Sequence, residues 1–136
     1  MRKQLWTDGL FTTACMLELM ATSGQSLAEL VSELPVFYQV KQKLDVPEEI
    51  KPQVFDKAKG LIWQLQRLPG VQHTDLDGLR LDFPDGSWVL LRMSGTEPNI
   101  RVMSDARTLE RAQELADQVM EYLRDALALV QIQTEQ

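Results

Sequence analysis

Three apolar runs follow one another closely between residues 79 and 104, and their spacing limits the folds that this chain can adopt. The runs cover residues 79–83, 87–92 and 99–104. The first two are separated by Pro84-Asp-Gly86, which is typical of a hairpin turn. Connections this short can join only antiparallel neighbours, because a parallel crossover needs about a dozen residues or more. We therefore expect three consecutive antiparallel strands.

One further strand and two helices complete the expected unit. Residues 36–44 alternate apolar and polar side chains, which predicts a strand. Residues 52–67 begin with a proline and gather their apolar side chains on one stripe, and residues from 108 onward show the same helical spacing. The order β-α-β-β-β-α predicts an α+β fold for residues 36–136: a four-stranded antiparallel sheet with two helices on one face and the other face open.

Two shorter helices are expected within residues 1–35, which we assign to a separate helical segment. Asp8 suits the cap of a helix over residues 8–22, and Ser26 and Glu29 occupy capping-box positions for a helix over 26–34. The first helix is apolar almost all round, as is typical of a helix inside a larger structure. We expect it to pack against the sheet domain or a second copy of the chain, with Cys15 as a buried, inert thiol.

Composition excludes several classes of function. The net charge of −6 argues against a nucleic-acid partner, which would require a basic face. Cys15 is the only cysteine, which indicates a reducing compartment, and we expect a cytoplasmic protein. His73 is the only histidine, which excludes a His-rich metal cluster, and we expect it in a solvent-facing loop. Residues 10–21 are interrupted by Glu18 and do not fit a signal peptide, and no run reaches the length of a membrane span.

The segment Arg92-Met-Ser-Gly-Thr-Glu-Pro-Asn-Ile-Arg101 concentrates hydrogen-bond donors. Both arginines belong to predicted strands, and the small residues between them form the connecting loop. The hydroxyls of Ser94 and Thr96, backbone N–H groups and two guanidinium groups together suit a phosphate. We expect Gly95 to adopt a positive φ that turns successive N–H groups toward one point. The alternative is an ordinary hairpin with two surface arginines.

This segment, together with Asp77-Gly-Leu-Arg-Leu-Asp-Phe-Pro-Asp-Gly-Ser-Trp-Val-Leu-Leu91 before it, resembles the C-terminal domain of the α-D-phosphohexomutases. That family includes phosphoglucomutase, phosphomannomutase and phosphoglucosamine mutase. Asp8-Gly-Leu-Phe-Thr-Thr and Ser26-Leu-Ala-Glu-Leu30 resemble the end of the family's third domain. The resemblance implies a TATA-box-binding-protein-like fold for domain four, and it makes residues 1–35 the remnant of the domain before it.

The resemblance also implies the roles of the loop residues. The residues that would contact the phosphate of the sugar substrate are Arg92, Ser94, Gly95, Thr96 and Arg101. Glu97 and Asn99 would support the loop, because a carboxylate beside a phosphate repels it.

The family's phosphoserine, its aspartates that hold Mg²⁺ and its sugar-binding loop have no counterpart in this sequence. We therefore expect no catalytic or metal-binding residues here, with Mg²⁺ and the remaining N-terminal domains belonging to a parent mutase. The fragment alone would be inactive. One alternative is a stand-alone module that binds phosphosugars without turning them over. A further alternative, suggested by the TATA-box-like fold, is a nucleic-acid-binding module, but the acidic net charge disfavours it.

Overall fold

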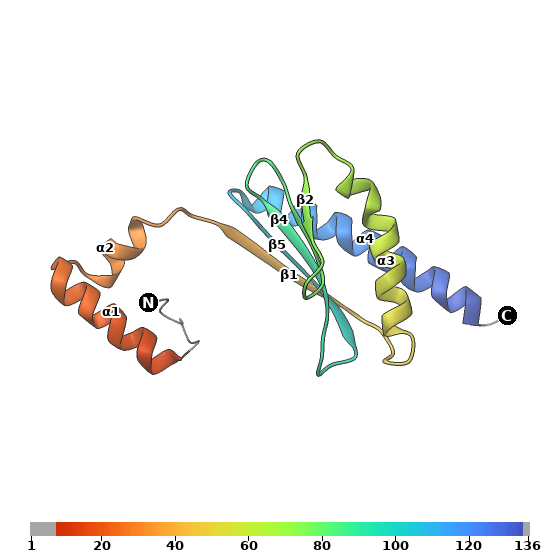
Figure 1. The fold of residues 1–136 in the computed structure, drawn as a ribbon, viewed down its shortest axis with the longest axis horizontal. Coiled ribbons are helices and arrows are strands. Elements are labelled where there is room, and N and C mark those ends of the chain that lie inside the picture. Colours follow the sequence, from red (N-terminus) through yellow and green to blue (C-terminus); the bar gives the residue numbers. More distant parts are fainter. Residues whose placement is uncertain (1–7, 135–136) are drawn as a thin grey trace. The chain divides into compact units, whose positions relative to one another are not determined.

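The computed structural model describes residues 8–134, which form two units that divide between Val36 and Phe37 (Figure 1). The N-terminal unit contains helices α1 (Gly9–Ser23) and α2 (Leu27–Ser32). The second unit contains five strands and two helices. In chain order these are β1 (Tyr38–Asp45), α3 (Lys51–Gln66), β2 (Gln72–Thr74), β3 (Leu79–Asp82), β4 (Trp88–Met93), β5 (Asn99–Ala106) and α4 (Leu109–Thr134).

Both predicted N-terminal helices are confirmed, and their caps are the expected ones. Asp8 Oδ1 accepts hydrogen bonds from the N–H groups of Leu10 and Phe11. Ser26 and Glu29 form the full capping box of α2. The Ser26 backbone N–H, followed by the Ser26 hydroxyl, lowers the pKa of the Glu29 carboxyl. Local capping chemistry therefore sets where these helices begin.

The expectation of a buried thiol in α1 is wrong. No residue of α1 is buried, and Cys15 is exposed. The physical reason is the size of the N-terminal unit: one short second helix cannot cover an apolar surface that extends almost all round α1. The packing of this helix against the sheet domain or a second copy of the chain stays a prediction.

The second unit is built on an antiparallel sheet with the strand order β1-β5-β4-β3-β2. The α+β class is confirmed, but the sheet has five strands instead of four. The additional strand, β2, has only exposed side chains, including that of His73, which was expected in a loop. It pairs along β3 through its backbone. Its polar residues carry no hydrophobic alternation, so no pattern in the sequence reveals it.

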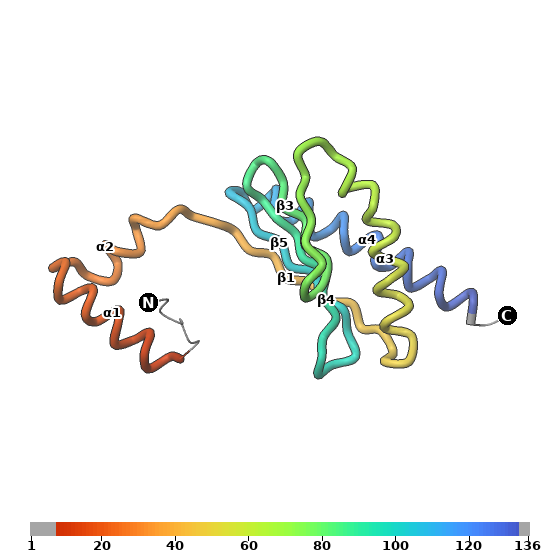
Figure 2. Tube along the Cα trace, in the orientation of Figure 1, coloured from red at the N-terminus to blue at the C-terminus, as the bar shows by residue number. Residues whose placement is uncertain are grey.

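Helices α3 and α4 pack together and cover the same face of the sheet, as the trace in Figure 2 shows. Alternate strand residues point into this core, among them Leu81 of β3, Leu91 of β4 and Val102 of β5. Ser104 is also buried there, and its hydroxyl donates to the Ala112 carbonyl of α4 at 2.6 Å. Neither α3 nor α4 covers the opposite face of the sheet, where the polar residues of the same strands lie together with partly buried apolar ones such as Leu90 and Met103.

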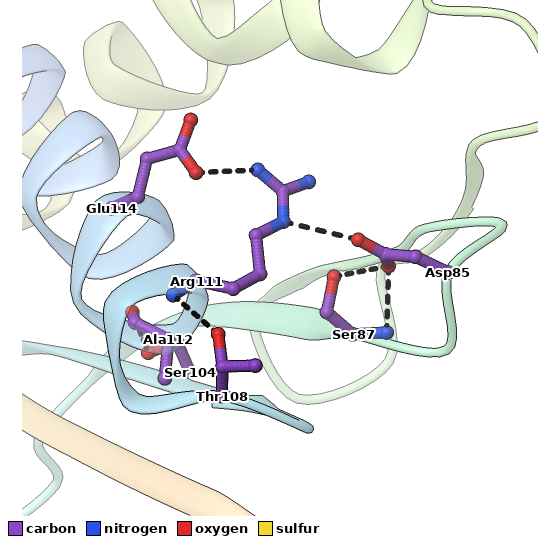
Figure 3. A network of polar contacts seen from close by, with 7 residues as sticks. All are labelled: Asp85, Ser87, Ser104, Thr108, Arg111, Ala112 and Glu114. Atoms are coloured by element: carbon purple, nitrogen blue, oxygen red, sulfur yellow. Dashed lines mark hydrogen bonds and ion pairs between the residues drawn. The ribbon is translucent and has the colours of Figure 1, made fainter.

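A polar network secures the turn between β3 and β4 to α4 (Figure 3). Arg111 Nε donates to Asp85 Oδ2 at 3.1 Å, and the same guanidinium pairs with Glu114. Asp85 in turn accepts hydrogen bonds from the hydroxyl and the N–H of Ser87. The Ser87 hydroxyl is the largest cause of a lowered pKa at Asp85. This network fixes the end of the sheet that lies opposite the 94–98 loop.

Candidate phosphate-binding site

Strand pairing places the two arginines of the predicted site side by side. Arg92 of β4 and Arg101 of β5 are directly paired, and after the next pair, Met93 and Ile100, the strands separate into loop 94–98. Leu91 and Val102, one position away, are buried under the helices. Since successive side chains of a strand alternate between faces, both arginines lie on the open face. The prediction that they belong to strands flanking a short loop is confirmed.

All five residues predicted to contact a phosphate line one pocket of about 250 Å³. The lining consists of Arg92, Met93, Ser94, Gly95, Thr96, Arg101 and Met103. The N–H groups of Gly95 and Thr96 have no hydrogen-bond partner within residues 8–134, and both residues are exposed. Two residues with backbone N–H groups unpaired in this part of the chain thus line the pocket together with two guanidinium groups.

A third cation belongs to the same surface. Lys43 of β1 is paired with Arg101 on the side opposite Arg92, so one row across three strands reads Lys43, Arg101, Arg92. A second pocket of about 360 Å³, lined in part by Lys41, Lys43 and Arg101, adjoins the first. Like charges directly opposite one another destabilise a sheet. A conflict of this kind is expected where a site is built for a ligand of opposite charge.

Sequence reasoning missed Lys43. The alternation of residues 36–44 places Lys41 and Lys43 on one face of their strand, and this pattern indicates a cationic strand face. The pairing of β1 with β5 depends, however, on the register of two strands that are far apart in the sequence. No local pattern could have placed Lys43 beside Arg101.

Each arginine of the pocket also contacts a carboxylate. Arg101 lies 3.1 Å from Glu97, and Arg92 lies 3.1 Å from Asp77. Both pairs are largely exposed to solvent, which screens them, so each contributes little to stability. A charge-assisted hydrogen bond to a buried or bound anion contributes about 1.5–3 kcal/mol. A dianion that contacts both guanidinium groups can therefore displace the carboxylates.

Glu97 and Asn99 form the internal support of the loop. Asn99 Nδ2 donates to Glu97 Oε2 at 2.7 Å, and the Glu97 pKa is lowered chiefly by this bond and next by Arg101. The Asn99 N–H donates to the Glu97 carbonyl, and the Ser94 N–H donates to the Asn99 carbonyl. Ser94 is buried, and its Oγ accepts from the Glu97 N–H at 3.2 Å. These bonds close the loop on itself.

The expected backbone conformation of Gly95 is wrong. The glycines with positive φ are Gly24, Gly70, Gly78 and Gly86, and Gly95 is not among them. A Cβ built on Gly95 would meet no atom within 4 Å. The five-residue loop therefore needs no left-handed residue at this position. What the glycine does leave is uncovered backbone, which permits close approach of a ligand.

Residues 8–134 contain no group of three His, Cys, Asp or Glu side chains that could hold a metal ion. In the same part of the chain, each helix is too short or too polar to cross a membrane. These residues therefore offer no ligand set for the Mg²⁺ that the resemblance implies.

An open antiparallel sheet with a row of cations and a donor-rich loop at a strand end defines an α+β domain suited to anions. A family model described as the phosphoglucomutase/phosphomannomutase C-terminal domain matches residues 43–122. The chain belongs to this family.

Known relatives support this membership. A phosphoglucomutase/phosphomannomutase of Thermococcus kodakarensis is 40% identical over 123 residues, which are 90% of this chain and 26% of that protein. A phosphopentomutase of the same organism is 36% identical over 110 residues, which are 81% of this chain and 24% of that protein. This chain therefore spans about a quarter of the length of these relatives.

A solved structure supports the fold. The crystal structure of a phosphoglucomutase/phosphomannomutase family protein from Burkholderia thailandensis superimposes with a TM-score of 0.64 at 24% identity. The match covers 89% of this chain and 25% of that one. The similarity at this level of identity concerns the fold.

Proposed function

We propose that this chain is the phosphate-clamping domain of a phosphohexose mutase, which interconverts hexose 1-phosphate and hexose 6-phosphate. Loop 94–98, Arg92 and Arg101 would bind the phosphate that is not being transferred, with Lys43 as an additional cation. The observation that carries the proposal is the pocket in which all five predicted residues meet beside the three-strand row of cations.

The names of the two relatives support a phosphate as the recognised group. One is named for glucose and mannose phosphates and the other for a pentose phosphate, yet both are similar to this chain at 36–40% identity. The chemical feature that these substrates share is the phosphate. A clamp formed by guanidinium groups and backbone N–H groups recognises a phosphate and is indifferent to the hydroxyl pattern of the sugar.

The mechanism that the family resemblance implies for a complete mutase would require such a clamp. A phosphoserine in another domain donates its phosphoryl group to the sugar monophosphate, and the resulting bisphosphate turns around and returns the other phosphate to the serine. The clamp must therefore hold either end of the sugar. Closing it over the substrate would also shield the transfer from water. Mg²⁺ and the sugar-binding loop would likewise belong to other domains, and this chain alone is expected to be inactive.

Titration of the ¹⁵N-labelled chain with glucose 1,6-bisphosphate tests this proposal. We expect saturable shifts of the Gly95 and Thr96 amide signals with a dissociation constant on the order of millimolar, because one wall of a cleft supplies few contacts. A micromolar constant would favour the stand-alone phosphosugar-binding module instead. Unchanged loop signals at tens of millimolar ligand, about ten times the expected constant, would refute the proposal.

A further inference from the structure

Lys51 is a buried lysine that lines neither pocket of the open face. It is the first residue of α3, and its side chain is only 6% exposed. Lysine is among the residues that are almost never fully buried unless they are paired. The position of Lys51 therefore requires partners that compensate for the loss of water.

Those partners connect α3 to loop 94–98. Lys51 Nζ donates to the Ser94 carbonyl at 2.8 Å and to the Glu97 carbonyl at 3.2 Å. It also pairs with Glu48 Oε2 at 2.6 Å. An ammonium group has three donors, so each of them has a partner here. Two of the three partners are backbone carbonyls of the loop itself.

The contact with the Ser94 carbonyl determines where the next N–H group points. In a trans peptide the C=O and the N–H of the following residue point in opposite directions. No peptide bond within the described part of the chain is cis. Because the Ser94 carbonyl accepts from Lys51, the Gly95 N–H points away from Lys51, and Gly95 itself lines the pocket.

We propose that Lys51 is a positioning residue of the phosphate clamp: its buried ammonium group holds the Ser94 and Glu97 carbonyls inward and so aims the Gly95 N–H at the bound anion. This inference rests on the proposed function. Lys51 does not touch the ligand. It acts through the loop backbone, because its charge is already paired with Glu48.

The first test measures the loop without ligand. In Lys51→Met, which removes all three donors, we expect faster hydrogen exchange at the Gly95 and Thr96 amides and altered signals for both. Ile62→Val is the matched control, because it loosens the packing of the same helix without touching the loop. Glu48→Gln is the second control: it removes the ion pair but leaves both carbonyl contacts, so the loop amides should stay as they are.

The second test measures binding of inorganic phosphate and of glucose 1,6-bisphosphate. We expect Lys51→Met to weaken binding about tenfold, the factor that corresponds to one lost hydrogen bond to a charged group. Ile62→Val should bind as the wild-type chain does, even though its melting temperature is lowered. A merely structural role of Lys51 would instead lower the melting temperature and leave the affinity unchanged.

If Lys51→Met does not fold, Lys51→Gln decides, since its amide retains two donors. We then expect faster loop exchange than in the wild type and an affinity that is weakened by less than tenfold. Loop amides and affinity that match the wild type in a folded Lys51 variant would overturn the proposal. So would equal effects in Ile62→Val. If the wild-type chain binds neither anion, the proposed function fails, and the ligand-free exchange of Gly95 and Thr96 still decides whether Lys51 orders the loop.

Discussion

Arg101→Ala is expected to weaken the binding of glucose 1,6-bisphosphate by about 10- to 100-fold. Arg101 lines both pockets of the open face and lies between the other two cations of its row. Two hydrogen bonds from its guanidinium to a phosphate would contribute about 3–6 kcal/mol. The pair with Glu97, which binding must break, is screened by solvent and offsets little of this contribution.

Solvent screening reduces this sum further, because the Arg101 side chain is 44% exposed. Reducing the sum by about half for this exposure leaves roughly 1.5–3 kcal/mol, which corresponds to about 10- to 100-fold in the dissociation constant. In titrations of the labelled chain, the wild type should approach saturation where Arg101→Ala shows only the initial slope. In a complete mutase carrying this domain, the same factor should appear in KM.

Arg107→Ala is the matched control for the loss of charge. Arg107 follows the other end of β5, away from loop 94–98, and either substitution changes the net charge from −6 to −7. We expect Arg107→Ala to bind as the wild type does. Equal weakening by both substitutions would show that the chain attracts anions only through its overall charge. An Arg101→Ala chain that saturates together with the wild type would refute the reasoning outright.

Three further outcomes follow from particular residues. Lys43→Gln should weaken the same binding by roughly three- to tenfold, and an unchanged titration would remove Lys43 from the site. Gly78→Ala should lower the free energy of unfolding, measured by urea denaturation, by about 3 kcal/mol or more. The reason is that Gly78 has φ +109° and that a Cβ there would clash with the Leu91 carbonyl oxygen. A variant as stable as the wild type would contradict this geometry. Ser87 lowers the pKa of Asp85 in the folded chain. The ionised carboxylate therefore stabilises the fold above the pKa that Asp85 has in the unfolded chain, and this contribution is lost as the pH falls through the pKa in the folded chain. In Asp85→Asn, the free energy of unfolding should therefore decrease less steeply at acid pH than in the wild type. An unchanged decrease would refute the stabilising role of the Asp85 carboxylate.

The strands between residues 79 and 104 could be predicted because their pairing is local. Short turns connect β3 to β4 and β4 to β5, so the sequence order alone determines which strands are neighbours. The same locality brought Arg92 and Arg101 together at the loop. Helix caps such as Asp8 and Ser26 are local as well, and they too were predicted.

The features that could not be predicted depend on contacts between distant segments. Lys43 and Lys51 reach the loop only after β1 and α3 have packed against it. The short strand β2 is defined by backbone pairing, which leaves no pattern in its side chains. The expectation of a positive φ at Gly95 failed for a different reason: glycine permits a left-handed conformation but does not require one.

The row of Lys43, Arg101 and Arg92 has a consequence for how the stability of this domain should be measured. Each cation comes from a different strand, so an anion seated among them fastens three strands at once and relieves their mutual repulsion. A ligand that binds only the folded chain raises the free energy of unfolding with its concentration. Melting temperatures recorded in phosphate and in an uncharged buffer would then describe two different thermodynamic systems, and the choice of buffer becomes one of the variables that set the stability of the fold.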